Sequence, residues 1–361
     1  MSATFTKLAY QTFQQSKSYF GLAHKTLSSQ LLNFIAPPPD GNKTKPLSSN
    51  VLGLLQERLS QLIDTDWRDA ERGVYSSELL FDNPWEDFFR YYPMLWVDMP
   101  QIWDRANQKR HQEFSSGIKT EGYPRYYLQN FHHQTDGYLS DMSANLYDLQ
   151  VEILFNGSAD AMRRRVLSPL KAALDDAGML DALQTRILDV ACGTGRTLNF
   201  LRSAIPNASL HGVDLSPAYL RKANELLSQQ PGTLPQLLQA NAEELPYRDD
   251  YFHAITCVFL FHELPAPVRQ RIIDQCFRVL QPGGVFVICD SIQRAESPEF
   301  EPLMDNFPAM FHEPFYRNYT EDNLSDRLWH AGFESIDTQI HFMSKYWIGR
   351  KPMSLSSGVS A

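Results

Sequence analysis

The chain has 361 residues and a formal net charge of −9, from 33 Lys and Arg against 42 Asp and Glu. Hydrophobic residues make up 43% of it, which excludes a wholly disordered chain, and the length predicts one long domain or two. The acidic balance excludes a general electrostatic attraction to nucleic acid, because such proteins carry a basic excess. Four cysteines without a C-x-x-C pair argue against a disulfide framework and favour a reducing compartment.

Residues 1–36 are predicted to form an amphipathic helix that carries no acidic side chain. Apolar residues recur at three- and four-residue steps, including Phe5, Leu8, Tyr19 and Leu27. Three interpretations remain open: a helix packed on its own protein, a peripheral membrane-surface helix, and an organelle transit peptide. The segment lacks Arg, which transit peptides favour. A cytoplasmic protein, with or without membrane contact, is therefore the expectation.

The region after this helix divides by composition. Residues 37–50 are predicted to be a linker, because Pro37, Pro38 and Pro39 cannot continue a helix. Residues 51–170 are predicted to be mainly helical and rich in aromatic side chains, which would form a core or in part line an apolar pocket. Three consecutive arginines, at 163–165, are expected on a solvated helix face or against acidic lipid.

Residues 171–352 show alternating strand and helix patterns, which predict parallel βαβ units. Two final stretches, 335–340 and 341–348, would close the sheet as an antiparallel pair. Residues 353–361 are small and polar and are expected to form a flexible tail. The predicted fold class is therefore α/β, preceded by a mainly helical N-terminal extension. The other candidate strands are 186–190, 209–213, 236–239, 253–259 and 284–289.

A glycine-containing turn follows the first of these strands. Gly193 and Gly195 permit close backbone approach, and the amide groups at the start of the next helix face a ligand at the strand ends. Asp214 ends the second strand, 19 residues after Gly195. A carboxylate at that place can accept hydrogen bonds from both hydroxyls of a ribose. The turn therefore predicts a nucleoside cofactor.

Two residues distinguish between the nucleoside cofactors. A dinucleotide loop would have a third glycine where this chain has Leu198, and Asp189 adds an acid four residues before Gly193. A carboxylate at a strand end repels a pyrophosphate but attracts an ammonium group. S-adenosylmethionine carries a ribose, an adenine and an amino acid end without a phosphate, so it is the predicted cofactor. The alternative is that Asp189 and Asp214 only cap the turns that follow them.

At these residues the chain resembles the class I S-adenosylmethionine-dependent methyltransferases. Three segments resemble those of the family, in the family's order. Residues 241–246 resemble the segment after its third strand, 251–264 its fourth strand and the loop after it, and 278–290 its helix, glycine turn and fifth strand. The likeness extends over residues 180–350 and is nearest to the small-molecule branch, which includes quinone and sterol C-methyltransferases. It implies a Rossmann-like seven-stranded sheet with helices on both faces and the last strand antiparallel.

The resemblance also implies further cofactor contacts. Asn241 stands where the family's side chain binds the adenine amino group, a position often held by Asp. Tyr147 lies in a stretch that resembles the small helix before the family's core, and it is either a cofactor contact or an ordinary buried tyrosine. The matched segments add four more expected contacts, Ala191, Leu215, Ala242 and Phe259.

Methyl transfer from a sulfonium needs alignment of the acceptor and exclusion of water above all. Where the acceptor carries a proton, His262 is the first candidate general base, and otherwise it orients its loop. His132, beside His133, could reach over the cleft, and Tyr319 and His312 could line the acceptor pocket.

Adjacent histidines point in different directions on a regular element, and no carboxylate cluster has ligand spacing, so no metal is expected.

Together these observations predict a methyltransferase that uses S-adenosylmethionine. The expected acceptor is a small, hydrophobic molecule of lipid-like character, enclosed between the sheet and the helical extension. Peripheral membrane contact would involve residues 1–36, and no nucleic acid is expected. The alternatives are a non-catalytic protein that binds the cofactor and recruits a partner, and an NAD(P)-dependent oxidoreductase, which Leu198 and Asp189 disfavour.

Overall fold

The computed structural model describes residues 3–35, 46–180 and 185–353. Most of the predicted linker and all of the predicted tail after Met353 lie outside these residues. Within them, no helix combines the length and the apolar character needed to cross a membrane.

Seven strands form one sheet in the order β3-β2-β1-β4-β5-β7-β6. The first five run parallel, and β7 pairs antiparallel with both β5 and β6, as predicted. The strand order reverses between β1 and β4, which is where parallel sheets of this kind open a crevice for ligands. The strands are β1 (Arg186–Val190), β2 (Ser209–Asp214), β3 (Gln236–Gln239), β4 (Phe252–Val258), β5 (Leu280–Ser291), β6 (Glu334–His341) and β7 (Ser344–Arg350).

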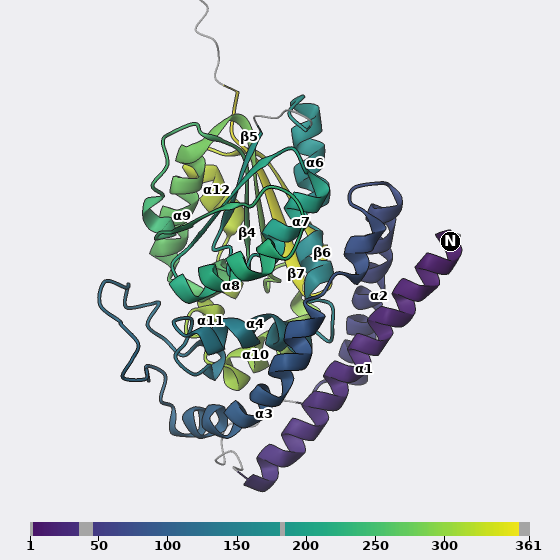
Figure 1. Ribbon diagram of the computed structural model, residues 1–361, viewed down its shortest axis with the longest axis vertical. Coiled ribbons are helices and arrows are strands. Elements are labelled where there is room, and N and C mark those ends of the chain that lie inside the picture. The colour runs from purple at the N-terminus through teal and green to yellow at the C-terminus, as the bar shows by residue number, and fades with distance from the viewer. Residues whose placement is uncertain (1–2, 36–45, 181–184, 354–361) are drawn as a thin grey trace, which may run out of the picture.

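Helices cover both faces of the sheet, as Figure 1 shows. Successive residues of a strand point to opposite faces, so Ile187 of β1 joins one apolar cluster and Leu188 joins the other. Helices α6, α7 and α8 complete the first cluster, whereas α9 and α12 complete the second. The helices are α6 (Leu167–Asp176), α7 (Arg196–Ala204), α8 (Pro217–Ser228), α9 (Ala266–Val279), α10 (Glu301–Met310), α11 (Tyr316–Glu321) and α12 (Leu324–Ala331).

The N-terminal extension is helical except for one long connection. Residues 109–140 contain only the short helix η2 (Phe131–His133), because Gly117, Gly122, Pro124 and Gly137 interrupt regular structure. This stretch departs from the helical expectation for residues 51–170. The remaining elements are α1 (Ala3–Ile35), α2 (Ser49–Glu71), η1 (Ser77–Phe81), α3 (Trp85–Gln108), α4 (Asp141–Leu154) and α5 (Ala159–Arg164).

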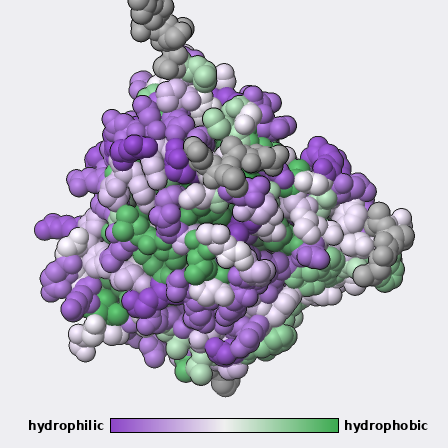
Figure 2. All heavy atoms as spheres, turned by 45° about the horizontal axis from the view of Figure 1, so that its top comes forward, coloured by the Kyte–Doolittle hydropathy of each residue, from purple (hydrophilic) through white to green (hydrophobic). Residues whose placement is uncertain are grey.

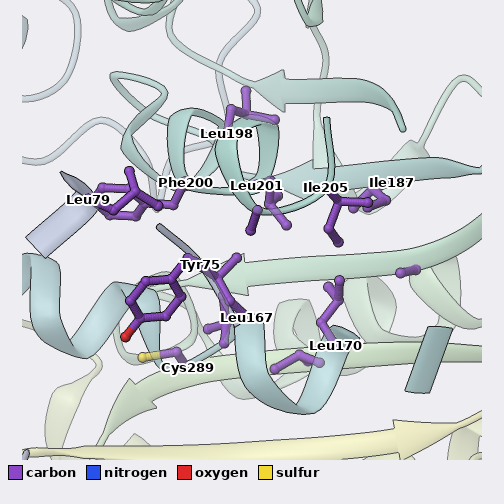
Figure 3. Close-up of a cluster of buried hydrophobic side chains, with 14 of the residues drawn as sticks. Tyr75, Leu79, Leu167, Leu170, Ile187, Leu198, Phe200, Leu201, Ile205 and Cys289 are labelled. Carbon is purple, nitrogen blue, oxygen red and sulfur yellow. The ribbon is translucent and has the colours of Figure 1, made fainter. Parts of the chain in front are cut away.

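The extension and the sheet share one hydrophobic core. Tyr75 and Leu79 of the extension belong to the same buried cluster as Ile187 of β1 and Leu198 of α7. Figure 3 shows these side chains gathered together with Leu170 of α6. The expected boundary at residues 170–171 falls inside α6, so the two regions are packed as a continuous structure.

Helix α1 packs with the face opposite its apolar stripe. Phe5, Leu8, Tyr19 and Leu27 are 57%, 61%, 72% and 54% exposed, whereas Tyr10 is fully buried. Polar contacts hold the inner face: Lys17 and Lys25, for example, bind acceptors near α4. The helix therefore does not pack through its apolar stripe. Buried hydrogen bonds and ion pairs on the opposite, polar face fix its orientation instead. The helix runs along the outer edge of the molecule in Figure 1.

The expectation of a solvated face at residues 163–165 is wrong. All three arginine side chains are buried, and each has a carboxylate partner. Arg163 lies 2.9 Å from Asp160, and Arg164 lies 2.6 Å from Asp66 of α2. Burial of arginine is possible here because acids neutralise it: Asp160 of the same helix for Arg163, and acids of α2 for Arg164 and Arg165. Figure 2 shows one face of the molecule, on which hydrophobic residues lie in separate patches among hydrophilic ones.

Candidate functional site

A first cavity opens at the carboxyl ends of β1, β2 and β4, next to the point where the strand order reverses. Eight of the ten cofactor contacts expected from the sequence line it, and Asp189 and Gly195 do not. These eight are Tyr147, Ala191, Gly193, Asp214, Leu215, Asn241, Ala242 and Phe259. The topology therefore gathers segments that lie up to about a hundred residues apart in the sequence into one wall.

The two glycines of the turn have different surroundings. Gly193 has φ +53°, and a Cβ there would meet only Tyr219, 3.9 Å away, which leaves space towards the cavity. Gly195 has φ +80° at the start of α7, and a Cβ there would lie 3.0 Å from Leu227 of α8. Gly193 can therefore admit a ligand, whereas Gly195 permits close packing of two helices.

Asp214 joins the glycine turn to the end of β2. Its Oδ2 accepts a hydrogen bond from Gly193 N at 2.9 Å, and its Oδ1 accepts one from Ser216 N at 2.8 Å. Burial raises the pKa of Asp214, while these backbone donors oppose the rise. Each carboxylate oxygen retains a lone pair for a further donor, so Asp214 can both order the turn and accept from a ribose.

Asp189 lies on β1 beside the first cavity without forming its wall. Its Oδ1 accepts a hydrogen bond from Thr256 Oγ1 at 2.6 Å, across the β1–β4 pairing. Burial raises the pKa of Asp189 to about 7, and Asp214 adds to this rise. A positively charged ligand nearby would favour the ionised form of Asp189.

Asn241 begins the short helix η3 (Ala242–Glu244). Its Oδ1 accepts from Glu243 N at 3.0 Å, and its Nδ2 lies 3.4 Å from Glu243 Oε1. The carbonyl oxygen can accept a second bond, so the expected contact with an amino group is compatible with this geometry.

Sequence reasoning missed the aromatic wall of the first cavity. Tyr126, Tyr127 and Tyr138 come from the irregular stretch 109–140, and Tyr219 comes from α8. Tyr138 and Tyr219 meet edge to face with ring centroids 5.4 Å apart. No motif spacing selects these tyrosines. For Tyr126, Tyr127 and Tyr138 the one signal is the density of tyrosines in a segment that lacks helical periodicity.

A second cavity, of about 570 Å³, adjoins the first. Its wall is largely apolar, with side chains from α2, α4 and α10 such as Leu55, Val151 and Leu303. Tyr147, Phe259 and Glu263 line both cavities. The volume falls within the range of about 300–1,000 Å³ typical of small-molecule sites. A small apolar molecule could thus lie beside a ligand of the first cavity.

His262 lies on the wall of the second cavity, in the short helix η4 (Phe261–Glu263) after β4. Its Nδ1 lies 2.7 Å from Asp290 Oδ1, and Asp290 Oδ2 accepts from Phe261 N at 2.7 Å. Burial lowers the pKa of His262, but Asp290 outweighs burial and raises this pKa to about 9. Below that pH the imidazole holds a proton, which opposes its use as a base.

His132 faces the same wall from η2. Its Nε2 lies 3.1 Å from Glu313 Oε1 and 3.8 Å from Glu263 Oε1. Burial lowers the pKa of His132 to about 3, with a further contribution from His262. The structure therefore brings the two candidate bases expected from the sequence, His132 and His262, to one place.

The other candidates have different positions. The His133 side chain turns away from His132 and lies among His111 and His312, whose rings stack 3.8 Å apart. The Tyr319 hydroxyl donates to Ser291 O at 2.5 Å in the core. Neither His312 nor Tyr319 lines either cavity. The aromatic residues between Phe81 and Trp103 do not line the second cavity either. Five of them pack together with side chains of α4: Phe88, Tyr91, Tyr92, Trp96 and Trp103.

Comparisons with known proteins find methyltransferases. The methyltransferase domain family matches residues 187–284. A malonyl-[acyl-carrier protein] O-methyltransferase of Geobacter sulfurreducens is 28% identical over 190 residues, which cover 50% of this chain and 68% of that protein. A demethylmenaquinone methyltransferase of Thermus thermophilus is 33% identical over 144 residues, which cover 40% of this chain and 60% of that protein.

Among solved structures, human N-acetylserotonin methyltransferase in complex with S-adenosylmethionine aligns with a TM-score of 0.48 and 12% identity. The alignment covers 78% of this chain and 72% of that one.

The fold, the turn after β1 and the match over residues 187–284 support a class I methyltransferase. The relatives named above are methyltransferases, and these findings support S-adenosylmethionine as the cofactor of this chain.

Proposed function

We propose that the enzyme transfers the methyl group of S-adenosylmethionine to a small, hydrophobic acceptor held in the second cavity. The observation that supports this most directly is the shared wall of Tyr147, Phe259 and Glu263 between the two cavities. A sulfonium methyl in the first cavity would face an acceptor atom across this wall. The relative from Thermus thermophilus is named for demethylmenaquinone, which agrees with an apolar acceptor.

In this proposal the residues of the first cavity hold the cofactor. Asp214 accepts hydrogen bonds from the ribose hydroxyls, and Asn241 accepts one from the adenine amino group. The negative charge of Asp189 attracts the positively charged end of S-adenosylmethionine. Gly193 leaves space for the ligand beside the turn. When bound, S-adenosylmethionine supplies the activated methyl group.

The apolar wall of the second cavity would exclude water and align the acceptor. Exclusion of water and alignment supply much of the rate acceleration in methyl transfer. The helices of the extension provide a large part of that wall: Leu52 and Leu55 come from α2, and Val151 and Leu154 come from α4. We infer that the extension selects the acceptor, while the sheet region binds the cofactor.

A cavity-filling substitution tests the acceptor site. Val151→Trp should reduce methyl transfer by at least tenfold, because the larger ring occupies the second cavity, while the affinity for S-adenosylmethionine stays within a factor of two or so. Transfer of label from S-adenosylmethionine to a lipid extract, followed by mass analysis of the product, gives the activity, and calorimetry gives the affinity. Leu238→Trp, at an exposed position of β3, is the matched control. Unchanged transfer by Val151→Trp would contradict the proposed site.

We also propose that α1 rests on a membrane surface through its exposed apolar stripe. Phe5, Leu8, Tyr19 and Leu27 lie on one face of the helix, and that face does not pack on the protein. An apolar acceptor dissolves in membranes, so surface contact would place the enzyme near its substrate.

Co-sedimentation with phosphatidylcholine vesicles tests this contact. The triple variant Leu8→Ser, Tyr19→Ser and Leu27→Ser should lose most of the bound fraction, because burial of each apolar side chain contributes about 1.5–3 kcal/mol. Trp329→Ser is the control, since Trp329 is 65% exposed on α12 and remote from α1 in the sequence. Equal co-sedimentation of the triple variant and the wild type would exclude the stripe as the contact.

A further inference from the structure

Donor atoms of two histidines and a glutamate meet where the two cavities adjoin. His132, His262 and Glu263 each place one ligand atom so that all three lie within 4.8 Å of one another. Glu263 Oε1 lies 3.8 Å from His132 Nε2 and 3.9 Å from His262 Nε2. These separations are too long for hydrogen bonds. Two ligand atoms that each lie about 2.1 Å from the same metal ion are at most about 4.2 Å apart. The separations of Glu263 Oε1 from the two Nε2 atoms are therefore compatible with a shared ion.

Glu313 is a second and independent observation at this place. Its side chain is fully buried, and its Oε1 lies 3.1 Å from His132 Nε2. Among the residues that the structure describes, neither carboxylate oxygen has a side-chain hydrogen bond of regular geometry, and His132 is the residue that interacts with this carboxylate. A buried carboxylate that faces only an imidazole is costly to ionise unless a cation neutralises it.

The charge around the cluster is unbalanced. Glu263, Glu313 and Asp290 bring three carboxylates together, and among the residues that the structure describes no Lys or Arg pairs with any of them. Within the described parts of the chain, their basic partners are the imidazoles of His132 and His262. Buried acids in proteins are generally paired or bound to a metal.

The outer contacts resemble those of metal-binding histidines. Asp290 Oδ1 lies 2.7 Å from His262 Nδ1, which leaves Nε2 directed at the cluster. Ligand histidines commonly bind a carboxylate through the other ring nitrogen, which fixes the ring and its tautomer. The Tyr138 hydroxyl also donates to Glu263, so that carboxylate is held in place.

We propose that His132, His262, Glu263 and Glu313 bind a divalent transition-metal ion. Two imidazoles with one or two carboxylates favour Zn²⁺ or another first-row ion, whereas Mg²⁺ and Ca²⁺ prefer oxygen ligands alone. The expectation of no metal, made from the sequence, missed this set because η2, η4 and the loop before α11 are far apart along the chain.

The location gives the ion a role. His132, His262 and Glu263 all line the second cavity, so an oxygen atom of an acceptor could reach the ion. Coordination of that oxygen would stabilise its ionised form, as a Lewis acid does. This role, unlike the site itself, rests on the proposed function.

Metal content and spectroscopy test the site without reference to activity. The full chain, purified and freed of metal by a chelator, is titrated with Zn²⁺ and with Co²⁺, whose visible absorption reports its ligands. The wild type should bind one ion per chain. Glu313→Gln and His132→Gln should each weaken binding by at least tenfold. The controls His330→Gln and Glu121→Gln remove exposed groups of the same kinds and should bind as the wild type does.

Two results would overturn the site: no binding of either ion by the wild type, or equal binding by wild type and both variants. Melting temperatures and calorimetry with S-adenosylmethionine on the same preparations show that each variant is folded. A chain that binds S-adenosylmethionine but neither ion overturns only the metal site. A chain that binds the ion but transfers no methyl to any apolar acceptor supports the site and contradicts the proposed function.

Discussion

At the scale of single residues, buried carboxylates hold the backbone and side chains around the first cavity in place. Asp214 connects the turn after β1 to the end of β2 through two backbone donors, and Asp189 lies behind the wall with a single side-chain donor, Thr256. The pKa of Asp189 rises to about 7 because burial disfavours its charge. The cofactor brings positive charge, so cofactor binding and ionisation of Asp189 should be linked.

The linkage predicts proton release on cofactor binding. Bound S-adenosylmethionine should lower the pKa of Asp189, so that affinity falls as the pH decreases below about 7, by up to tenfold per pH unit. Calorimetry near pH 6.5 in two buffers of different ionisation enthalpy measures the protons released. Asp189→Asn should bind more weakly, with less dependence on pH. Wild-type affinity that stays constant between about pH 5.5 and 7.5 would contradict this assignment.

At the scale of elements, polar contacts between helices fix the extension on the sheet. Asp66 of α2 receives Arg164 of α5 at 2.6 Å, the Tyr75 hydroxyl at 2.5 Å and the Tyr10 hydroxyl of α1. All four side chains are buried. One carboxylate therefore joins three helices, and the orientation of α1 depends on it.

Removal of this carboxylate should destabilise the fold strongly. Asp66→Ala leaves Arg164 as an uncompensated buried charge, which costs about 3–5 kcal/mol of unfolding free energy. Asp64→Ala on the same helix is the matched control, since Asp64 is partly exposed and lies 3.7 Å from Lys7, and its loss should cost under about 1 kcal/mol. Urea unfolding measures both. Similar losses in the two variants would show that Asp66 does not hold the helices together.

At the scale of the whole molecule, the extension and the sheet share one hydrophobic core. If this core governs stability, the two regions unfold together. Trp67 and Leu80 of the extension lie in the same cluster as Val285 and Tyr346 of the sheet. The second cavity likewise takes its wall from both regions.

Urea unfolding should therefore show one transition. Tryptophan fluorescence and far-ultraviolet circular dichroism should give the same midpoint, because a single core couples the two regions. Deletion of residues 1–36 should lower the midpoint, since it removes Tyr10 from that core. Two separate transitions, or a truncated chain as stable as the full one, would show that the extension is an independent unit.

The sequence by itself determined the sheet and the part of the first cavity that lies at the strand ends. Gly193, Asp214 and Asn241 follow successive strands, and parallel strands bring such positions to one edge whatever the rest of the chain does. Local patterns suffice there, because each contact depends on a strand end and its adjoining turn. The amphipathic character of α1 was equally plain from its periodicity.

The tertiary structure alone decided which face of α1 packs, where Arg163, Arg164 and Arg165 lie, and how His132 meets His262. Most of these depend on a partner far away in the sequence, such as Asp66 for Arg164 or Glu313 for His132, whereas Arg163 pairs with Asp160 of its own helix. Burial of a charged group is favourable only where such a partner neutralises it, and no local pattern reveals that partner.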